Sequence, residues 1–449
     1  MQPRPDHDHN TAGLTPTHLL AVLLPLLLLY FTFRFLDLTP GLLTPSVIRD
    51  IIFGRPRSRS RSPNLSSTSN SNSSNPTTNS IPPYFSLHRA IASYDAYPAL
   101  ALAEHAAMQR SYARLTYAHR RTGYALGYTR KLEGLRRAEE VNAGVLRAVA
   151  GLARVQFAWG EGGDGEGGER GEGGMGLWAM MKWVMWREED VRPDVGRVRE
   201  AMKHFVRDWS EEGKEERGKI FEPILRVMRQ SEEEGRKGEK VLVPGSGLGR
   251  LAWEVAELGY DTTAIELSYF MTLAFRFLLS PQTTQTPNQH TVHPYAYWFS
   301  HSRSSTNTLR GISFPDVVPR LQNNFHLIEG DFLTHNPSQN ASYDYVVTLF
   351  FIDTSTNIIS TLEHIYALLK PGGTWINLGP LLWTGGAQAR MELSLEEVLE
   401  LAETVEFRMA GEEDEVRRRR TVECEYTADR TAMMKWLYQA EFWVATKPA

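Results

Sequence analysis

The sequence predicts an α/β protein built on a doubly wound, mostly parallel sheet that follows an N-terminal helical accessory region. Three observations indicate this fold class. A glycine-rich turn within Lys240–Glu266 joins a short apolar strand to an apolar-periodic helix and a second strand. Apolar strands then alternate with helices towards the C-terminus, and an acidic residue follows each of three strands. Ligands of such sheets bind at the carboxyl ends of the strands, where we expect these acids to gather.

Composition narrows the class of protein. The chain has 449 residues, enough for one large α/β domain with accessory segments. Its formal net charge of −4 gives no indication of a nucleic-acid partner. Cys424 is the single cysteine, which excludes intramolecular disulfides and a cysteine-rich metal site, and favours a reducing compartment.

Residues 1–40 contain an apolar stretch, Leu19–Phe33, that extends to Leu36 if Arg34 reaches a membrane surface. A spanning helix needs roughly 20 apolar residues, so the stretch is slightly short. Five arginines follow it between Arg49 and Arg61, so we predict a membrane anchor over residues 19–36 with the C-terminal side in the cytoplasm. The alternatives are an apolar helix packed on the folded domain and a soluble cytosolic or nuclear protein.

Three further segments complete the predicted organisation. Residues 41–82 are rich in Ser and Asn and predict a disordered linker. Residues 83–158 carry apolar residues at helical spacing and predict an accessory region of two or three helices. Residues 159–176 are rich in Gly and Glu and predict a flexible loop, after which the sheet domain is expected over residues 177–449.

A helical segment over Val195–Arg229 leads into the glycine turn, with a local break near Asp208-Trp209-Ser210. His204 and Arg207 are three residues apart and therefore share one face of this helix. From spacing alone they fit a lid over a ligand or an ordinary surface.

The glycine turn is the centre of the predicted site. Gly245, Gly247 and Gly249 allow a tight backbone turn and the close approach of a ligand. Glu266 ends the second strand, where a carboxylate can accept hydrogen bonds from two ribose hydroxyls.

The later elements bring two more acids to the same edge of the sheet. In order, we predict a helix over Leu267–Leu279, an irregular insertion over Ser280–Pro319, strands over Phe325–Ile328 and Tyr343–Phe351, a helix over Ile358–Leu369, a strand over Thr374–Leu378, and two β-like runs near Thr421–Tyr426 and Glu441–Thr446. Asp331 and Phe332 follow the first of these strands, and Asp353 follows the second. Asp353 also fits the N-cap of a helix.

The glycine spacing separates two adenosine cofactors. A dinucleotide pyrophosphate is normally bound by G-x-G-x-x-G, whereas here Gly245, Gly247 and Gly249 alternate and Arg250 follows. S-adenosylmethionine has no phosphate; it requires a close turn for its amino-acid end, an acid for the ribose and another near the adenine. The glycine turn, Glu266 and Asp331 provide these in order.

This ordered set, with LKPGG before the next strand, resembles class I S-adenosylmethionine-dependent methyltransferases, which implies a Rossmann-like sheet. The segments VLVPGSGLGRLAWEVAELGY, FVRDWSEEGKEER, FFIDT, LKPGGTWINLGPLL and MMKWLY are together similar to the carnosine N-methyltransferase (N2227-like) family. Two segments of the insertion match as well: His293–Arg303 (HPYAYWFSHSR) and Phe314–Pro319 (FPDVVP). The resemblance covers Val195–Lys447 well and Pro83–Gly151 weakly.

The resemblance assigns cofactor contacts to the helix before the turn, to the turn and to the acids. These residues are His204, Arg207, Gly245, Gly247, Gly249, Glu266, Asp331 and Phe332. It favours the lid interpretation, with Arg207 pairing with the methionine carboxylate. His204 stands where relatives have glutamine.

The resemblance also assigns a substrate wall. Asp353 matches the family's substrate carboxylate. Thr384 stands where the family has histidine, and Trp436 and Tyr438 stand where it has a pair of tyrosines in the last helix.

The implied reaction is methyl transfer from S-adenosylmethionine to an imidazole nitrogen of carnosine or a related histidine-containing peptide. Asp353 would accept the other imidazole N–H, as the aspartate of a Ser-His-Asp triad does. The alternatives are a protein-histidine N-methyltransferase, a non-catalytic S-adenosylmethionine-binding protein and, more distantly, a dehydrogenase. We consider a homodimer and a membrane contact through residues 19–36, and expect no nucleic-acid partner and no metal.

Overall fold

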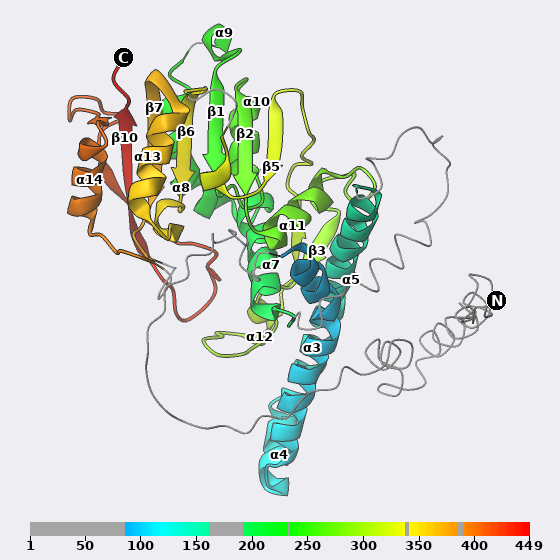
Figure 1. The fold of residues 1–449 in the computed structure, drawn as a ribbon. Helices are drawn as coiled ribbons and strands as arrows, with labels where there is room; N and C mark the ends of the chain where they lie inside the picture. Colours follow the sequence, from blue (N-terminus) through cyan, green and yellow to red (C-terminus); the bar gives the residue numbers. More distant parts are fainter. Residues whose placement is uncertain (1–85, 161–191, 232, 337–340, 384–388) are drawn as a thin grey trace, which may run out of the picture. The chain divides into compact units, whose positions relative to one another are not determined.

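The protein is built around a central sheet of eight strands (Figure 1). The structure is a computed structural model, and it describes residues 86–160, 192–231, 233–336, 341–383 and 389–449. The strands are β1 (Lys240–Pro244), β2 (Asp261–Glu266), β5 (Phe325–Glu329), β6 (Tyr343–Leu349), β7 (Leu369–Gly379), β8 (Arg408–Met409), β9 (Arg420–Cys424) and β10 (Tyr438–Thr446). Their order is β5-β2-β1-β6-β7-β10-β8, and β9 also pairs with β10. The first five strands are parallel, while β10 runs antiparallel to β7, β8 and β9.

Both faces of the sheet are covered by helices, because side chains along each strand alternate between two apolar clusters. In β1, Val241 and Val243 enter the larger cluster and Leu242 enters the smaller one. The helices are α7 (Val195–Trp209), α8 (Lys214–Met228), α10 (Arg250–Glu257), α11 (Tyr269–Leu279), α13 (Ile358–Leu368) and α14 (Leu395–Thr404), with the short α9 (Glu233–Arg236) and α12 (Ser305–Thr308). Helices α13 and α14 belong to the smaller cluster, and α7, α8, α10 and α11 to the larger. The predicted doubly wound α/β fold class is therefore confirmed.

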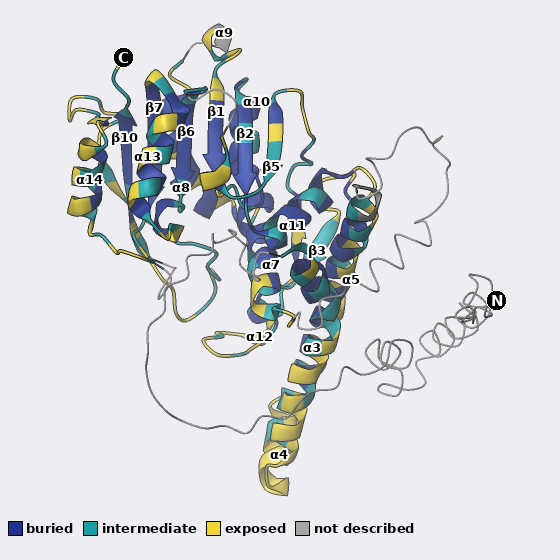
Figure 2. Cartoon of the chain, viewed as in Figure 1, coloured by how far each residue is buried: buried dark blue, intermediate teal, exposed yellow. Residues whose placement is uncertain are grey.

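Three helices precede the sheet: α3 (Leu87–Ala113), α4 (Tyr117–Ala125) and α5 (Tyr128–Gly160). Tyr94 on α3 is fully buried, and its hydroxyl donates a 2.6 Å hydrogen bond to the carbonyl of Phe270 on α11. Buried residues of α3 and α5 belong to the same cluster as α7 and α11. Helix α4, at the end of this helical region far from the sheet, has no buried residue (Figure 2). The accessory helices and the sheet domain thus share one apolar core.

The insertion after α11 forms a two-stranded antiparallel ribbon. Its strands are β3 (His290–Val292) and β4 (Ile312–Phe314). Asn142 of α5 binds this ribbon through two hydrogen bonds, accepting from the backbone nitrogen of His293 at 2.7 Å and donating to its carbonyl at 3.0 Å.

Some element predictions were wrong in detail. Strand β6 ends at Leu349, because Phe350 adopts a positive φ of 50° that takes the chain off the ladder. Strand β7 begins at Leu369 and includes the Lys370–Gly373 segment, whereas the strand was predicted to begin at Thr374. Trp436 lies outside any helix and Tyr438 begins β10, so the predicted last helix is absent there.

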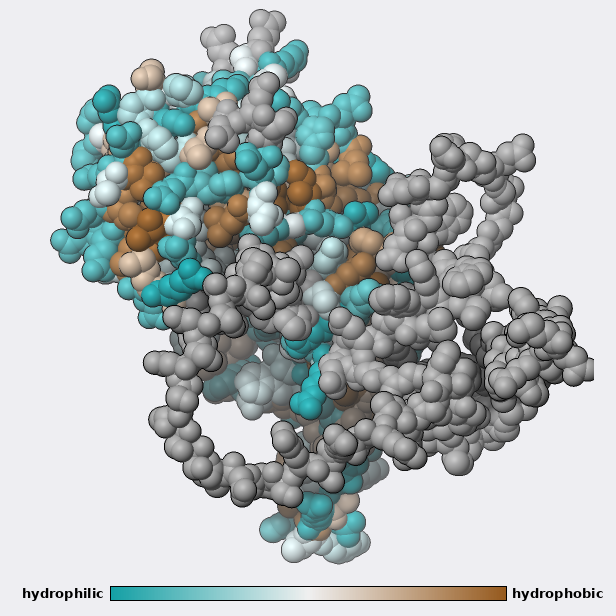
Figure 3. All heavy atoms as spheres, in the orientation of Figure 1, coloured by the Kyte–Doolittle hydropathy of each residue, from teal (hydrophilic) through white to brown (hydrophobic). Residues whose placement is uncertain are grey.

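Several predictions fall outside the described residues. They concern the apolar stretch 19–36, the linker 41–82, residues 161–176 of the Gly/Glu-rich segment and Thr384. Among the helices that the structure does describe, none combines the length and apolarity needed to cross a bilayer. On the face shown in Figure 3, apolar and hydrophilic residues are interspersed over the α/β part.

Candidate functional site

The sequence-predicted residues come together at the carboxyl ends of the parallel strands. The glycine turn follows β1, Glu266 ends β2, Asp331 and Phe332 follow β5, and Asp353 follows β6. Because β5, β2, β1 and β6 are consecutive in the sheet, these groups line one edge of it.

The glycine turn has the conformation that its three glycines require, since Gly245, Gly247 and Gly249 all have positive φ, between 57° and 71°. A Cβ on Gly245 would lie 2.5 Å from the ring of Phe351, so no side chain fits there. Around Gly247 the nearest side-chain atom to such a Cβ is Nη2 of Arg207, at 4.0 Å. The turn therefore has an open face at Gly247 that lies beside a guanidinium group.

Glu266 is held against this turn by backbone donors. Its Oε2 accepts a 2.8 Å hydrogen bond from the Gly247 nitrogen, and its Oε1 accepts one of 2.8 Å from the Ser268 nitrogen. Burial raises the pKa of Glu266, and the two backbone donors oppose this effect. A carboxylate has about four acceptor sites, so these bonds leave it able to accept from a ligand.

Helix α7 brings His204, Arg207 and Asp208 to the turn as a buried cluster. Arg207 donates from Nε and Nη2 to the two oxygens of Asp208, at 2.6 and 3.1 Å. Burial alone would lower the pKa of Arg207, but the Asp208 carboxylate outweighs it and the pKa is raised. Burial likewise opposes ionisation of Asp208, and Arg207 nevertheless holds the pKa of Asp208 well below its usual range. Both groups are therefore charged at neutral pH.

His204 lies on the same buried face of α7. Its Nδ1 is 3.5 Å from Oδ2 of Asp208 and forms no well-aligned hydrogen bond with any described residue. Burial first, and then the charge of Arg207, lower the pKa of His204. The imidazole is therefore neutral at pH 7.

Tyr426 links this cluster to the other side of the site, and sequence reasoning missed it. Its ring lies beneath the Arg207 guanidinium, 4.4 Å from Cζ to the ring centroid, and meets His204 edge to face at 5.7 Å. Its opposite neighbour is Phe350, stacked at 4.5 Å. Tyr426 follows β9 in a loop, and no local sequence pattern connects it with α7.

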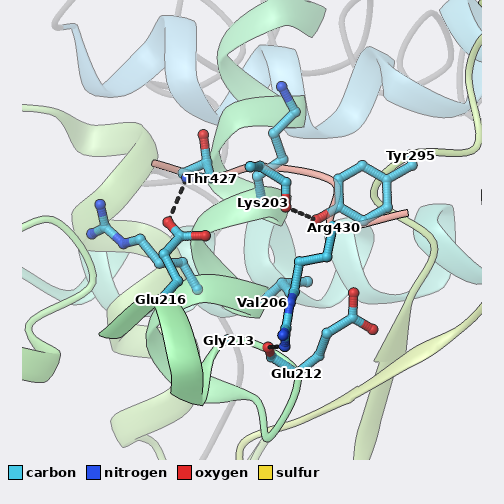
Figure 4. A pocket seen from close by; sticks show the side chains of 10 residues that line it. Lys203, Val206, Glu212, Gly213, Glu216, Tyr295, Thr427 and Arg430 are labelled. Atoms are coloured by element: carbon cyan, nitrogen blue, oxygen red, sulfur yellow. Dashed lines mark hydrogen bonds between the residues drawn. The ribbon is translucent and has the colours of Figure 1, made fainter. Parts of the chain in front are cut away.

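A polar pocket lies beside α7, and one of its hydrogen bonds holds Thr427, the residue that follows Tyr426 (Figure 4). The Glu216 carboxylate, on α8, accepts a 2.6 Å hydrogen bond from the backbone nitrogen of Thr427. The pocket is lined by Lys203, Val206, Arg207, Glu212, Gly213, Glu216, Tyr295, Thr427, Ala428 and Arg430. These residues include Arg207 but none of the glycine turn or the strand-end acids.

Phe350 and Phe351 form the floor between the glycine turn and Asp353. The left-handed backbone of Phe350 places its ring against Tyr426 and, edge to face at 5.7 Å, against Tyr438. Phe351 packs against Gly245 and meets Phe332 edge to face at 5.4 Å. The turn after β6 therefore contacts the turns after β1 and β5.

Asp331 shapes the end of β5. Its Oδ1 accepts a 2.9 Å hydrogen bond from the backbone nitrogen of Leu333, which caps a single 3-10 turn (Phe332–Thr334). Phe332 is buried against Phe351 and His364. Asp331 itself is partly exposed, and its second oxygen faces no described hydrogen-bond donor.

Asp353 is a buried carboxylate without a positively charged partner among the described residues. It is 4% exposed, and its Oδ2 accepts one 3.0 Å hydrogen bond from the backbone nitrogen of Leu382. Burial raises the pKa of Asp353 to about 6. The charge of Asp353 contributes, after burial, to a raised pKa of Tyr438, so the two groups are neighbours. A buried acid that titrates near neutral pH is typical of functional sites.

The other predicted substrate residues differ in position. Tyr438 is partly buried at the start of β10, whereas the side chain of Trp436 is 73% exposed. Three neighbours of Trp436 in sequence are also exposed: Met433, Met434 and Leu437. So is Leu382, whose backbone nitrogen donates to Asp353. Thr384 lies outside the described residues.

Comparisons with known proteins agree on one family. The family model described as carnosine N-methyltransferase matches residues 185–449. The carnosine N-methyltransferase of Mus musculus is 38% identical over 264 residues, covering 57% of this chain and 64% of that protein. That of Schizosaccharomyces pombe is 35% identical over 269 residues, covering 55% of this chain and 70% of that protein. The chain thus spans a little under two thirds of the length of the mouse protein.

Among solved structures, the complex of the Haloferax volcanii Trm112 methyltransferase activator with a putative methyltransferase matches at 14% identity and a TM-score of 0.34. The match covers 56% of this chain and 98% of that one. The fold class of this chain follows from its own strand order.

Proposed function

Because the chain belongs to the carnosine N-methyltransferase family, we propose that it transfers a methyl group from S-adenosylmethionine to an imidazole nitrogen of carnosine or a related histidine-containing peptide. Asp353, buried and singly hydrogen-bonded at the end of β6, is the observation that supports the acceptor chemistry.

The residues around the glycine turn fit S-adenosylmethionine. The open face at Gly247 lies beside the Arg207 guanidinium, which suits the amino acid carboxylate of the cofactor. Glu266 retains acceptor capacity for the ribose hydroxyls, and Phe332 offers an apolar contact next to Asp331 for the adenine. Bound S-adenosylmethionine supplies an electrophilic methyl group, so the protein mainly has to position the acceptor.

Asp353 is the residue that we assign to the acceptor. Only the imidazole nitrogen without a proton can attack, so the group that receives the other N–H selects the tautomer. The Asp353 carboxylate accepts that N–H and stabilises the imidazolium that develops, as the aspartate of a catalytic triad does. Productive transfer also requires the nucleophile to lie about 3–3.5 Å from the methyl carbon. We assign the binding of the polar end of the acceptor to Tyr438, which neighbours Asp353.

A second candidate acceptor is a histidine within a protein. The exposed apolar side chains of Trp436, Leu437 and Leu382 favour it, because a dipeptide cannot cover so many apolar residues. Trp436 and Thr384 also replace the tyrosine and histidine of the family pattern. The identity of the acceptor therefore depends on the residues around Tyr438 rather than on those around the glycine turn.

One experiment separates these candidates. The full-length chain is incubated with isotopically labelled S-adenosylmethionine and either carnosine or a cell extract, and products are identified by mass spectrometry. Methylation of carnosine supports the first proposal, and the fragment ions locate the modified nitrogen. Label incorporated only into extract proteins at histidine supports the second. S-adenosylhomocysteine binding without transfer to any imidazole compound would indicate a non-catalytic cofactor-binding protein.

We also propose the domain limits stated above, membrane anchoring through residues 19–36 and a homodimer. Membrane association is tested by carbonate extraction of the full-length chain compared with a chain lacking residues 1–40. The assembly state is tested by light scattering on the same two chains.

A further inference from the structure

The insertion after α11 contributes one carboxylate, that of Asp316, to a buried cluster next to the glycine turn. Its Oδ2 accepts a 2.7 Å hydrogen bond from Nη2 of Arg217, and its Oδ1 accepts one of 2.7 Å from Nη1 of Arg250. The side chains of Arg217, Arg250 and Asp316 are 5%, 9% and 14% exposed. We call this trio the carboxylate bridge.

The carboxylate bridge satisfies the last carbonyl groups of α7, which have no partner within the helix. Nη1 of Arg217 donates to the carbonyls of Arg207 and Ser210, at 2.8 and 2.7 Å. Nη1 of Arg250 donates to the carbonyl of Asp208 at 3.2 Å, and the backbone nitrogen of Asp316 donates to that of Trp209 at 2.8 Å. Four consecutive carbonyls, at the negative end of the helix dipole, therefore depend on this one cluster.

The bridge also fastens α7 to the glycine turn. Arg250 is the first residue of α10, directly after Gly249, and its guanidinium lies 4.8 Å from the Trp209 ring. The indole nitrogen of Trp209 donates a 2.9 Å hydrogen bond to the carbonyl of Leu248, within the turn. The backbone of Arg207 is thus fixed relative to the turn that its side chain faces.

Charge explains why a carboxylate is needed at this point. Arg217 and Arg250 are close enough that the charge of Arg250 adds to burial in lowering the pKa of Arg217. Arg250 also pairs with Glu254, at 2.7 Å, whereas Asp316 is the one acidic side chain paired with Arg217 among the described residues. Removing the negative charge would therefore leave the buried guanidinium of Arg217 unpaired beside that of Arg250, and the two groups would separate or recruit water. Either response moves the carbonyls that they hold.

We propose that Asp316 is a positioning residue for cofactor binding, which sets the Arg207 guanidinium against the glycine turn through the carboxylate bridge. The insertion then contributes to cofactor binding through the contacts of Asp316 with Arg217 and Arg250. This proposal rests on the proposed function, because it assigns Arg207 to the amino acid carboxylate of S-adenosylmethionine.

The test compares two ligands that differ at that carboxylate. S-adenosylhomocysteine has the amino-acid end that Arg207 would bind, and 5′-methylthioadenosine lacks it. Binding of each to the full-length chain is measured by calorimetry. Asp316→Asn should weaken S-adenosylhomocysteine binding by about tenfold or more and leave 5′-methylthioadenosine binding within about twofold. Asp316→Glu, which keeps the charge, should recover part of the lost affinity.

The matched control is Asp344→Asn. Asp344 also forms a partly buried ion pair, with Lys370, but near the start of β6, at the opposite end of the strand from the site. It should change the binding of neither ligand. A double-mutant cycle adds a second readout: Arg207→Ala combined with Asp316→Asn should lose less S-adenosylhomocysteine affinity than the sum of the single losses.

Three results would overturn the proposal: unchanged S-adenosylhomocysteine binding in Asp316→Asn, equal losses for the two ligands, or additive effects in the cycle. If Asp316→Asn does not fold, Arg217→Lys replaces it, because an ammonium keeps the charge but cannot span two carbonyls and a carboxylate. The same ligand-selective loss is expected, and its absence overturns the proposal. A wild-type chain that binds neither ligand contradicts the proposed function itself.

Discussion

At the scale of single residues, Asp353 lies in an environment that opposes the charge it needs for the proposed reaction. It is buried without a positively charged partner among the described residues, and its pKa is raised to about 6. Burying such a carboxylate costs stability whenever it is charged. The protein keeps it in that state at neutral pH, which suits a group that must accept an N–H from an acceptor.

The pH dependence of the reaction follows from two groups. On the free enzyme, Asp353 must be ionised, with its pKa of about 6. The acceptor imidazole must be neutral, and its free pKa is about 6.5. The logarithm of kcat/KM should therefore fall with a slope approaching 2 as the pH drops below both values. In Asp353→Asn the slope should approach 1, and a wild-type profile with slope 1 would contradict the role of Asp353.

The same substitution should separate activity from stability. The pKa of Asp353 is about 6 when folded, against a usual 3.8, so the folded state binds this proton more tightly. That stability is fully present below about pH 3.8 and is lost as the pH rises through about 6. At pH 7, Asp353→Asn should therefore raise the free energy of unfolding by about 1–3 kcal/mol while lowering kcat by about 10²–10⁴-fold.

Denaturant unfolding at pH 4 and pH 7 and single-turnover kinetics check both halves of this prediction. The stabilisation should shrink towards pH 4, while S-adenosylhomocysteine affinity stays near the wild-type value. A variant that is less stable at pH 7 than the wild type would contradict the account of Asp353 as a buried charge.

At the scale of elements, the glycine turn is where close packing and backbone conformation coincide. Gly249 has a φ of 71°, and a Cβ there would lie 2.3 Å from the ring of Phe275 on α11. Gly249→Ala should therefore lower the free energy of unfolding by about 1–3 kcal/mol and weaken S-adenosylhomocysteine binding. Gly218→Ala is the control, because Gly218 lies inside α8 with nothing within 4 Å of a Cβ.

Gly218→Ala should stabilise the chain by about 0.5–1 kcal/mol through helix propensity and leave ligand binding unchanged. Thermal unfolding and calorimetric titration of the two variants measure these effects. Equal stability of Gly249→Ala and the wild type would show that the turn relaxes around the added methyl group.

Sequence patterns predicted the elements that depend on local periodicity, and missed those that depend on distant partners. The parallel strands and helix α13 follow from apolar runs and spacing, so it was predictable that the acids at the strand ends gather at one edge of the sheet. Phe350 was placed inside a strand, because nothing in its neighbourhood shows the left-handed backbone imposed by packing against Tyr426 and Tyr438. The loop before β10 was predicted as helix, but Asp429 accepts from Arg310, and Met433 donates its backbone N–H to His301.

At the scale of the whole molecule, the accessory helices belong to the same core as the sheet. Tyr94 and Tyr97 are fully buried in the cluster that contains α7 and α11. The region matched by the family model, residues 185–449, therefore leaves out side chains that cover the helix carrying Arg207.

This arrangement predicts a large effect from a residue outside the matched region. Tyr94→Ala should lower the free energy of unfolding by about 3–5 kcal/mol, because it opens a cavity between α3 and α11. Tyr94→Phe is the control: it loses only the hydrogen bond to Phe270 and should cost about 0.5–1.5 kcal/mol. Urea unfolding of both variants checks the difference. Near-equal values would mean that α3 separates from the sheet domain before the sheet unfolds.

Cys424 makes the far end of the site open to direct chemical observation. It is the chain's single cysteine, 1% exposed at the end of β9, two residues before Tyr426. Burial raises the pKa of its thiol to about 11, so in the native state the thiol is both shielded and protonated. Alkylation of the native chain therefore requires β9 to detach from β10, and its rate reports how often the segment that carries Tyr426 opens. The alkylation rate of Cys424 is thus a native probe of how often the aromatic contact between the Arg207 cluster and Phe350 opens, and it needs no introduced label.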